Sequence, residues 1–481
     1  MTTGLNLWDG DVWSFVLTLS VLLLAMLFAN TLRNLCGFIR RLIIPSSVLG
    51  GFILLFVNFL LKRFAGITLY STATLEILTY HGLGLGFAAL ALRNGKRKEE
   101  KDKGGAFNAG VTVVNGYLLQ AVMGLIITIG LYYIIGSFYA SGILLPMGYG
   151  QGPGQAYNWG HNFELGSWAA PFTGGFQYGT SFGLTVAAMG FVSASIGGII
   201  YLNGLKKKGI YKGNLGDDVK EELTLDTFVG ENEIPLAESM DKFTIQVALV
   251  FIAYTLAFLF MKGVNLLLDP EEVGATGIKG TIQGMVWGFQ FLFGSVFAIL
   301  MRLVIRRLRK TGVLKREYIN DFMLNRISGF MFDLMVVASI AAIDLSAFTR
   351  VEFTLPLSLI CLAGAFGTYY YLRFVCKRIF PSYEHESFLS LYGMQTGTAS
   401  TGVILLRELD PTFQTQASDN LVYHQPWAIL FGAPMFLLVG VAPQSPQKAV
   451  LTLAACFGLF VLCNLVLFRK QLFKSKKKAG R

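Results

Sequence analysis

Two segments of this chain place glycine and polar side chains within otherwise apolar sequence. Residues 141–160 break at Pro146 and then carry glycine at every second position from Gly148 to Gly154, while residues 386–411 mix three glycines with glutamine, threonine and serine. A regular helix is disfavoured there, because proline lacks an N–H donor and glycine gains much freedom on unfolding. We expect both segments to bind a small solute, and the candidate binding residues are Tyr149, Gln151, Gly152, Gln155, Gln395, Thr396, Thr398, Ser400 and Thr401.

The chemistry of these segments suits an anion and a cation together. Free backbone N–H groups with glutamine, threonine and serine side chains suit a carboxylate, and free carbonyl groups suit Na⁺. Alternatively, the glycines serve close helix packing, as small residues do in membranes. Packing explains the glycines but not the polar side chains, since an unpaired polar group in an apolar setting is costly.

One acidic side chain, Asp333, lies in the middle of the apolar stretch 318–348. At 1.5 Å per residue it is too far from either end of a helix there to reach water. Acids within a membrane segment are commonly functional. We expect Asp333 to bind sodium or to act in gating. Alternatively, it is a structural partner of a hairpin backbone group or of Arg326, which lies about two helical turns earlier on the same face.

Membrane helices must position these residues, because the composition excludes a water-soluble chain. Of the 481 residues 53% are hydrophobic and only 14% are charged, whereas soluble domains have about 25% charged residues. Crossing a bilayer takes about 20 apolar residues. The sequence therefore predicts an all-α polytopic membrane protein, and no cleaved signal peptide is expected after the acidic N-terminal stretch. Eleven stretches qualify: 12–32, 43–62, 73–92, 107–136, 174–205, 243–268, 278–308, 318–348, 354–380, 420–445 and 449–468.

The stretches fall into two groups on either side of residues 206–242, a predicted cytoplasmic linker. Each group has four spans, a polar glycine-rich segment and a fifth span, so the second group enters the membrane from the opposite side. The sequence thus predicts two inverted five-helix repeats, 1–205 and 243–445, each with a hairpin. Residues 446–481 add one C-terminal transmembrane helix and a basic tail. Paired interrupted segments in two halves indicate a transporter's binding site.

The net charge of +11 reports topology and gives no support for a nucleic-acid partner. With the N-terminus outside, 32 of the 40 Lys and Arg residues lie in segments on the cytoplasmic side and six lie outside. Such a bias is the positive-inside signal of a plasma membrane protein. We expect an integral protein of a bacterial-type inner membrane, in contact with lipid, with its C-terminus in the cytoplasm.

Three motifs resemble the sodium:glutamate symporter (GltS-like) family. IPSSVLGG at 44–51 is similar to the start of its second span, GYGQGPGQAY to its first glycine hairpin, and YGMQTGTASTG to its second. The resemblance covers most of residues 12–445 in layout. It implies re-entrant hairpins that meet from opposite sides, a homodimer, and sodium-driven uptake with an elevator movement of the part that carries the hairpins.

The leading hypothesis is a sodium-coupled symporter for glutamate or a related small carboxylate or amino acid, which is an anionic or zwitterionic solute. An ion channel is an alternative, since paired glycine-rich hairpins also build pores, and so is a proton-coupled anion transporter of the same fold. A membrane enzyme is not expected, because the sequence has no HExxH motif, paired catalytic acids or Ser/His/Asp cluster.

Overall fold

The computed structural model describes residues 6–94, 104–165, 176–211, 241–271, 277–411, 414–469 and 471. Over these residues it is helical, without a strand. Ten of the described helices are long and apolar enough to cross a membrane, and a bent pair would make an eleventh. The prediction of a helical membrane protein is confirmed. Most of the predicted linker, the basic cluster at 95–103 and the basic tail lie outside the described residues.

The long helices follow the eleven predicted stretches in order. In the first half they are α1 (Gly10–Leu35), α3 (Ser46–Ala65), α4 (Thr72–Leu92), α5 (Gly105–Ile135) and α7 (Gly179–Lys207). In the second half they are α9 (Lys242–Leu268), α10 (Gly277–Gly288) with α11 (Gln290–Lys310), α12 (Asp321–Ala341), α13 (Val351–Ile379), α17 (Gln425–Val441) and the additional helix α18 (Pro446–Leu467).

Shorter helices connect the spans. They are α2 (Gly37–Arg41), η1 (Ser141–Ile143), η2 (Pro146–Gly150), α6 (Pro153–Leu165), η3 (Leu345–Thr349), α14 (Glu384–Thr396), α15 (Ala399–Arg407), α16 (Gln416–Tyr423) and η4 (Ala442–Gln444). Both predicted hairpin segments therefore fold as pairs of short helices, η2 with α6 and α14 with α15.

The seventh predicted stretch is broken where the sequence predicted one continuous helix. α10 and α11 meet at Phe289 with a bend of 62°. No proline causes this bend, since residues 277–310 contain none. The break leaves the Gly288 carbonyl without its helical partner, and amides of α6 replace that partner: Gln155 Nε2 donates to it at 3.4 Å and Asn158 Nδ2 at 3.1 Å.

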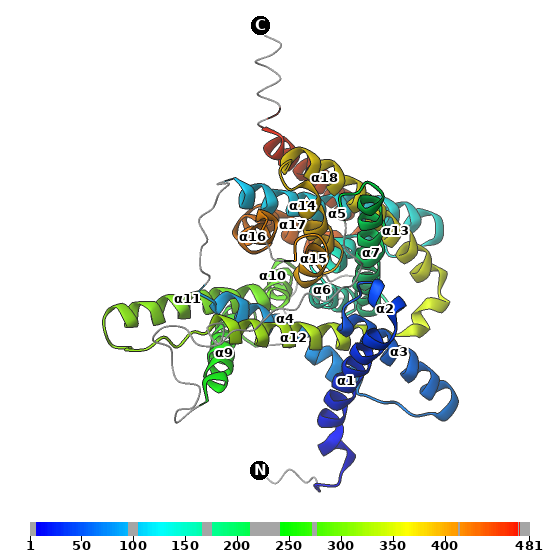
Figure 1. Cartoon of the computed structure of the whole chain (residues 1–481). Helices are drawn as coiled ribbons and strands as arrows, with labels where there is room; N and C mark the ends of the chain where they lie inside the picture. The colour runs from blue at the N-terminus through cyan, green and yellow to red at the C-terminus, as the bar shows by residue number, and fades with distance from the viewer. Residues whose placement is uncertain are drawn as a thin grey trace.

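The helices form two packing groups, which Figure 1 shows in its lower and upper halves. The framework group is α1, α3, α4, α9, α11 and α12, in which neighbouring helices pack along the series α1, α3, α12, α4, α11, α9. The hairpin group is α5, α7, α13, α17 and α18 with the four short helices η2, α6, α14 and α15. One cluster of buried apolar side chains lies mainly within the hairpin group and another lies mainly within α4, α9, α11 and α12. A third cluster joins the framework helices to Tyr157 of α6 and to Leu184, Ala188 and Phe191 of α7.

Each half of the chain contributes to both groups in the same way. Its first three spans join the framework group, and its later spans and short-helix pair join the hairpin group. The contacts correspond as well: α1 packs on α3 as α9 packs on α11, α3 packs on α12 as α11 packs on α4, and α7 packs on α13 as α17 packs on α5.

Candidate functional site

The first predicted hairpin segment is interrupted at Gln151 and Gly152. η2 ends at Gly150, and α6 begins at Pro153, where the missing N–H costs nothing because the first amides of a helix lack partners anyway. Gly152 has φ +83°, which a residue with a side chain rarely adopts. Glycine is therefore required at this break by the backbone itself.

The second hairpin changes direction at Gly397 and Thr398. α14 ends at Thr396 and α15 begins at Ala399. The Thr398 hydroxyl caps α15 by accepting a hydrogen bond from the Thr401 N–H at 3.4 Å. Threonine suits this position because its oxygen satisfies one of the unpaired first amides of the helix.

The two breaks are in contact, although about half the chain separates them in sequence. A Cβ atom placed on Gly152 would lie 3.2 Å from Thr398 Cγ2 and 3.5 Å from the Gly397 carbonyl oxygen. The N-terminal ends of α6 and α15, which carry partial positive charge, therefore lie beside one another. Ala399 and Ser400, in the first turn of α15, are exposed.

Two fully buried glutamines lie next to these breaks. Gln120 of α5 donates from Nε2 to the Gln395 carbonyl oxygen at 2.9 Å and to Thr368 Oγ1 of α13 at 2.9 Å. Gln395 Nε2 donates to the Thr112 carbonyl oxygen at 3.4 Å. Among the described residues, neither Gln120 Oε1 nor Gln395 Oε1 has a hydrogen-bond partner. Two amide oxygens thus remain unpaired in the protein interior, where each would be costly unless a ligand binds there.

Glycines bring the backbone close to both amides. A Cβ on Gly116 of α5 would lie 1.5 Å from Gln395 Oε1, and one on Gly150 would lie 3.4 Å from Gln120 Oε1. Gln120 Oε1 therefore lies next to Gly150 of the first hairpin segment, and Gln120 Nε2 donates a hydrogen bond to the second.

The remaining predicted binding residues divide by location. Tyr149 is fully buried, and its hydroxyl donates to the Cys361 carbonyl oxygen of α13 at 2.8 Å. The Thr396 hydroxyl donates to the Tyr392 carbonyl oxygen at 2.6 Å within α14. Gln151 is half-buried at the first break. The structure therefore brings Gln151, Gly152, Gln395, Thr396, Thr398, Ser400 and Thr401 to the two breaks, and it places Tyr149 and Gln155 elsewhere.

Gln155 belongs to a second polar cluster between the packing groups. Its Nε2 donates to the Gly288 carbonyl oxygen at the α10–α11 break, and its Oε1 accepts from Trp159 Nε1 at 3.1 Å. In the same described region the oxygens Asn158 Oδ1 and Gln290 Oε1 are buried without a hydrogen-bond partner. This cluster joins α6 to the framework group.

Asp333 lies outside the hairpin group. It is an exposed residue of α12, and its side chain interacts with the Ser47 hydroxyl at the start of α3. Arg326 does not pair with it, since the Arg326 guanidinium lies over the Phe322 ring at 5.0 Å from the ring centre. The sodium role of Asp333 stays a prediction, and the alternative of an Arg326 partner is not seen.

The sequence analysis missed Gln120, Asn158 and Gln290. The sequence does mark Gln120 as unusual, since it is an amide within the strongly apolar stretch 107–136. The sequence does not mark Asn158 and Gln290 in this way, because they are important only through the break at Phe289.

The described residues contain no group of three or more His, Cys, Asp or Glu side chains placed to hold a metal ion. Comparison of the chain with protein-family models, with characterised proteins and with solved structures found no match.

Proposed function

We propose that this chain is a sodium-coupled secondary transporter, of the sodium:glutamate symporter type, for a small carboxylate or amino acid. The observation that carries the proposal is the contact between the two helix breaks beside the unpaired oxygens of Gln120 and Gln395. Transporters commonly bind solute and ion where interrupted helices of two halves meet.

The breaks offer different chemistry to the solute and to the ion. The adjacent N-terminal ends of α6 and α15 attract a carboxylate, and Thr398 and Ser400 add hydroxyl groups there. The amide oxygens of Gln120 and Gln395 instead suit Na⁺, because Na⁺ binds oxygen atoms, including the neutral oxygens of amides. We therefore assign Gln395 to the ion, whereas the sequence pattern alone grouped it with the solute residues.

The corresponding packing of the two halves supports inverted repeats. Helices in equivalent places of the two halves make equivalent contacts, and the positive-inside pattern orients them in opposite directions. With that orientation the first hairpin enters from outside and the second from the cytoplasm.

The separation into two packing groups supports an elevator movement. The hairpin group has its own apolar core and contacts the framework group mainly through α6, so it could slide as one body against α4 and α12. The framework group would then be the fixed part, and it would provide the surface for a homodimer.

Transport in proteoliposomes tests this proposal. A sodium gradient should drive glutamate or aspartate accumulation and saturable counterflow, whereas an equal potassium or proton gradient should not. Sodium-independent, non-saturable flux would favour a channel, and accumulation driven by pH alone would favour the proton-coupled alternative.

A further inference from the structure

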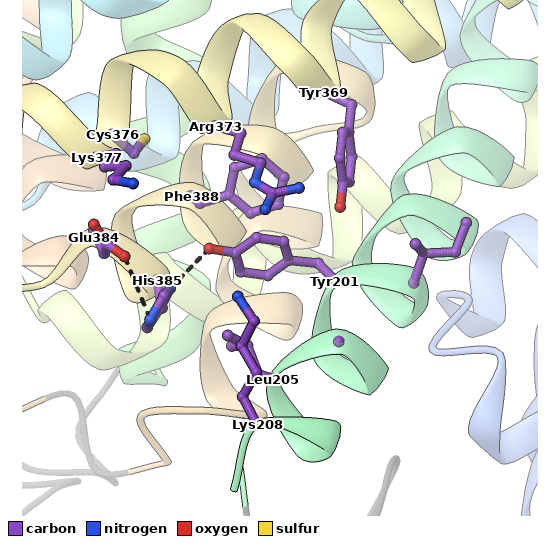
Figure 2. A pocket seen from close by; sticks show the side chains of 12 residues that line it. Tyr201, Leu205, Lys208, Tyr369, Arg373, Cys376, Lys377, Glu384, His385 and Phe388 are labelled. Carbon is purple, nitrogen blue, oxygen red and sulfur yellow. Dashed lines mark hydrogen bonds and ion pairs between the residues drawn. The ribbon is translucent and has the colours of Figure 1, made fainter. Parts of the chain in front are cut away.

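A cavity of about 330 Å³ lies where α7 and α13 end and α14 begins (Figure 2). Phe388 is the lining residue of α14 nearest to the second break, and it stands seven residues before Gln395, so the cavity begins about 10 Å from that break along the helix. The cavity is therefore separate from the proposed transport site. It is lined by Ile200, Tyr201, Gly204, Leu205, Lys208, Tyr369, Arg373, Cys376, Lys377, Glu384, His385 and Phe388.

The cavity carries an excess of positive charge. Lys208, Arg373 and Lys377 line it, and none of these three cations lies within 4.0 Å of a carboxylate among the described residues. In Figure 2 the Lys208 and Arg373 side chains approach the Tyr201 ring from opposite sides. Concentrated cations without acidic partners repel one another, and a bound anion would relieve that repulsion.

The single lining acid is already engaged. Glu384 Oε1 lies 3.5 Å from His385 Nε2, and His385 Nδ1 lies 2.8 Å from the Tyr201 hydroxyl. These partners assign a tautomer in which Nε2–H donates to the carboxylate and the tyrosine donates to Nδ1. Glu384 is therefore turned toward His385, and the three cations remain for a ligand.

Apolar stripes lead from the membrane part of both helices into the cavity. On α7, Ile196 and Ile200 are 52% and 59% exposed, and Ile200 lines the cavity together with Lys208, which follows the end of the helix. A spacing of four residues keeps side chains on one face of a helix. A single molecule with an apolar body could therefore follow this face up to Lys208.

α13 has a matching stripe. Phe366 and Tyr370 are 61% and 64% exposed, and Arg373 and Lys377 continue the same face at helical spacing. Both helices thus present an exposed apolar stripe that ends in cations at one shared cavity. A phospholipid would contact both the cations and the stripes, whereas a soluble anion would contact the cations alone.

We propose that this cavity binds the phosphate headgroup of an anionic phospholipid, whose acyl chains lie along the stripes of α7 and α13. The cations pair with the phosphate, Tyr201 and Tyr369 border the headgroup, and Ile200 lies at the boundary between headgroup and chains. Lys and Arg residues next to a membrane commonly recognise anionic lipids in this way. The proposal does not depend on the transport function.

Native mass spectrometry of the full-length protein, titrated with phosphatidylglycerol or phosphatidylcholine, tests it. The wild type should prefer phosphatidylglycerol. The triple variant K208Q/R373Q/K377Q should lose affinity for it by about fivefold per cation removed. The matched control R33Q/R40Q/R41Q removes one basic residue at the end of α1 and two at the end of α2, which are predicted to lie on the same side of the membrane. This control should bind like the wild type. Equal loss in both triple variants, or no loss in either, would overturn the proposal.

Two further arms separate the lipid from a soluble anion and allow for poor folding. Ile200→Gln should weaken lipid binding while leaving any binding of inorganic phosphate unchanged; if phosphate alone binds and the lipid does not, the lipid proposal is wrong. If the triple variant does not elute as a single species, Lys208→Gln and Glu384→Gln decide. Lys208→Gln should lower phosphatidylglycerol binding, and Glu384→Gln should leave it unchanged or raise it. If Glu384→Gln lowers the binding and Lys208→Gln does not, the proposal is wrong.

Discussion

Gln120 and Gln395 are 275 residues apart in the sequence and are joined by a hydrogen bond of 2.9 Å from the Gln120 side chain to the Gln395 carbonyl oxygen. That carbonyl lies in the last turn of α14, where helical carbonyls lose their usual partners. Gln120 supplies the missing donor from a continuous helix. The second hairpin is thus held at its break by a side chain of the first half.

Replacing Gln120 tests the importance of this bond. Gln120→Met keeps the length of the side chain but leaves the Gln395 carbonyl and the Thr368 hydroxyl without their donor, so we expect the free energy of unfolding to fall by about 1–3 kcal/mol. Thermal unfolding of the purified protein measures the change. Gln151→Met, at a half-buried position, serves as the control and should change the free energy of unfolding by less than about 0.5 kcal/mol. Equal stability of the two variants would show that the Gln120 bond is not important.

Gly116 tests the close approach of α5 to Gln395. Gly116→Ala would place a methyl group 1.5 Å from Gln395 Oε1 and must displace that side chain. We expect a loss of stability of about 1–3 kcal/mol together with a loss of sodium-driven uptake. Gly130→Ala, on the same helix with nothing within 4 Å of its added Cβ, should be neutral or slightly stabilising. If both variants transport like the wild type, Gln395 is not fixed by α5.

The contact between the breaks is open to a double-mutant cycle. Gly152→Ala introduces a Cβ 3.2 Å from Thr398 Cγ2, in addition to the strain of φ +83°. Thr398→Ser removes that methyl group and keeps the capping hydroxyl. In uptake and stability assays, Thr398→Ser should therefore rescue part of the Gly152→Ala defect, with a coupling of about 0.5 kcal/mol or more. Strictly additive effects would mean that the hairpins are not in contact at these residues.

The orientation of the spans is testable with single cysteines. Cys36 is exposed, and the other four cysteines are buried. A Cys36→Ser variant therefore has no exposed cysteine among the described residues and is a suitable background for labelling single introduced cysteines. In intact cells Ile67→Cys and Leu267→Cys should react with an impermeant maleimide from outside. Ile210→Cys and Val313→Cys should react only after the membrane is opened. The reverse pattern would contradict the inverted-repeat arrangement. The four positions are exposed, so access depends on sidedness alone.

The spans were predictable because the bilayer demands a length of apolar sequence that few other structures share. The two interruptions near Gly152 and Gly397 were predictable as well, since proline and glycine disfavour a continuous helix. The break at Phe289 was not predicted, because Gly288 alone does not indicate a break: Gly294 lies inside the unbroken helix α11. The break is stabilised by Gln155 and Asn158 from a helix more than a hundred residues earlier, and a single sequence does not show that contact.

The arrangement of polar residues within the site was predictable only in part. The sequence grouped Tyr149 with the solute residues because it stands beside Gln151, but neighbours on a short helix point in different directions. In the structure Tyr149 packs into α13 while Gln151 stays at the break. Which side of a broken helix faces the ligand is decided by the partner helices, so it depends on tertiary contacts.

The last prediction separates two possible places for sodium. Asp333→Asn removes the acidic charge in the middle of the stretch 318–348, while Gln395→Met removes a neutral oxygen at the helix breaks. If the breaks bind the ion, Gln395→Met should raise the half-saturating sodium concentration about tenfold. The reason is that one polar contact to a charged ligand contributes about 1.5 kcal/mol of binding free energy. Asp333→Asn should then leave the sodium curve near that of the wild type, because this side chain is exposed and interacts with Ser47 of the framework group.

Uptake across a sodium series at a fixed solute concentration measures the sodium dependence of both variants. A sodium curve that shifts for Asp333→Asn and not for Gln395→Met would move the ion to α12 and would leave the hairpin breaks to the solute alone.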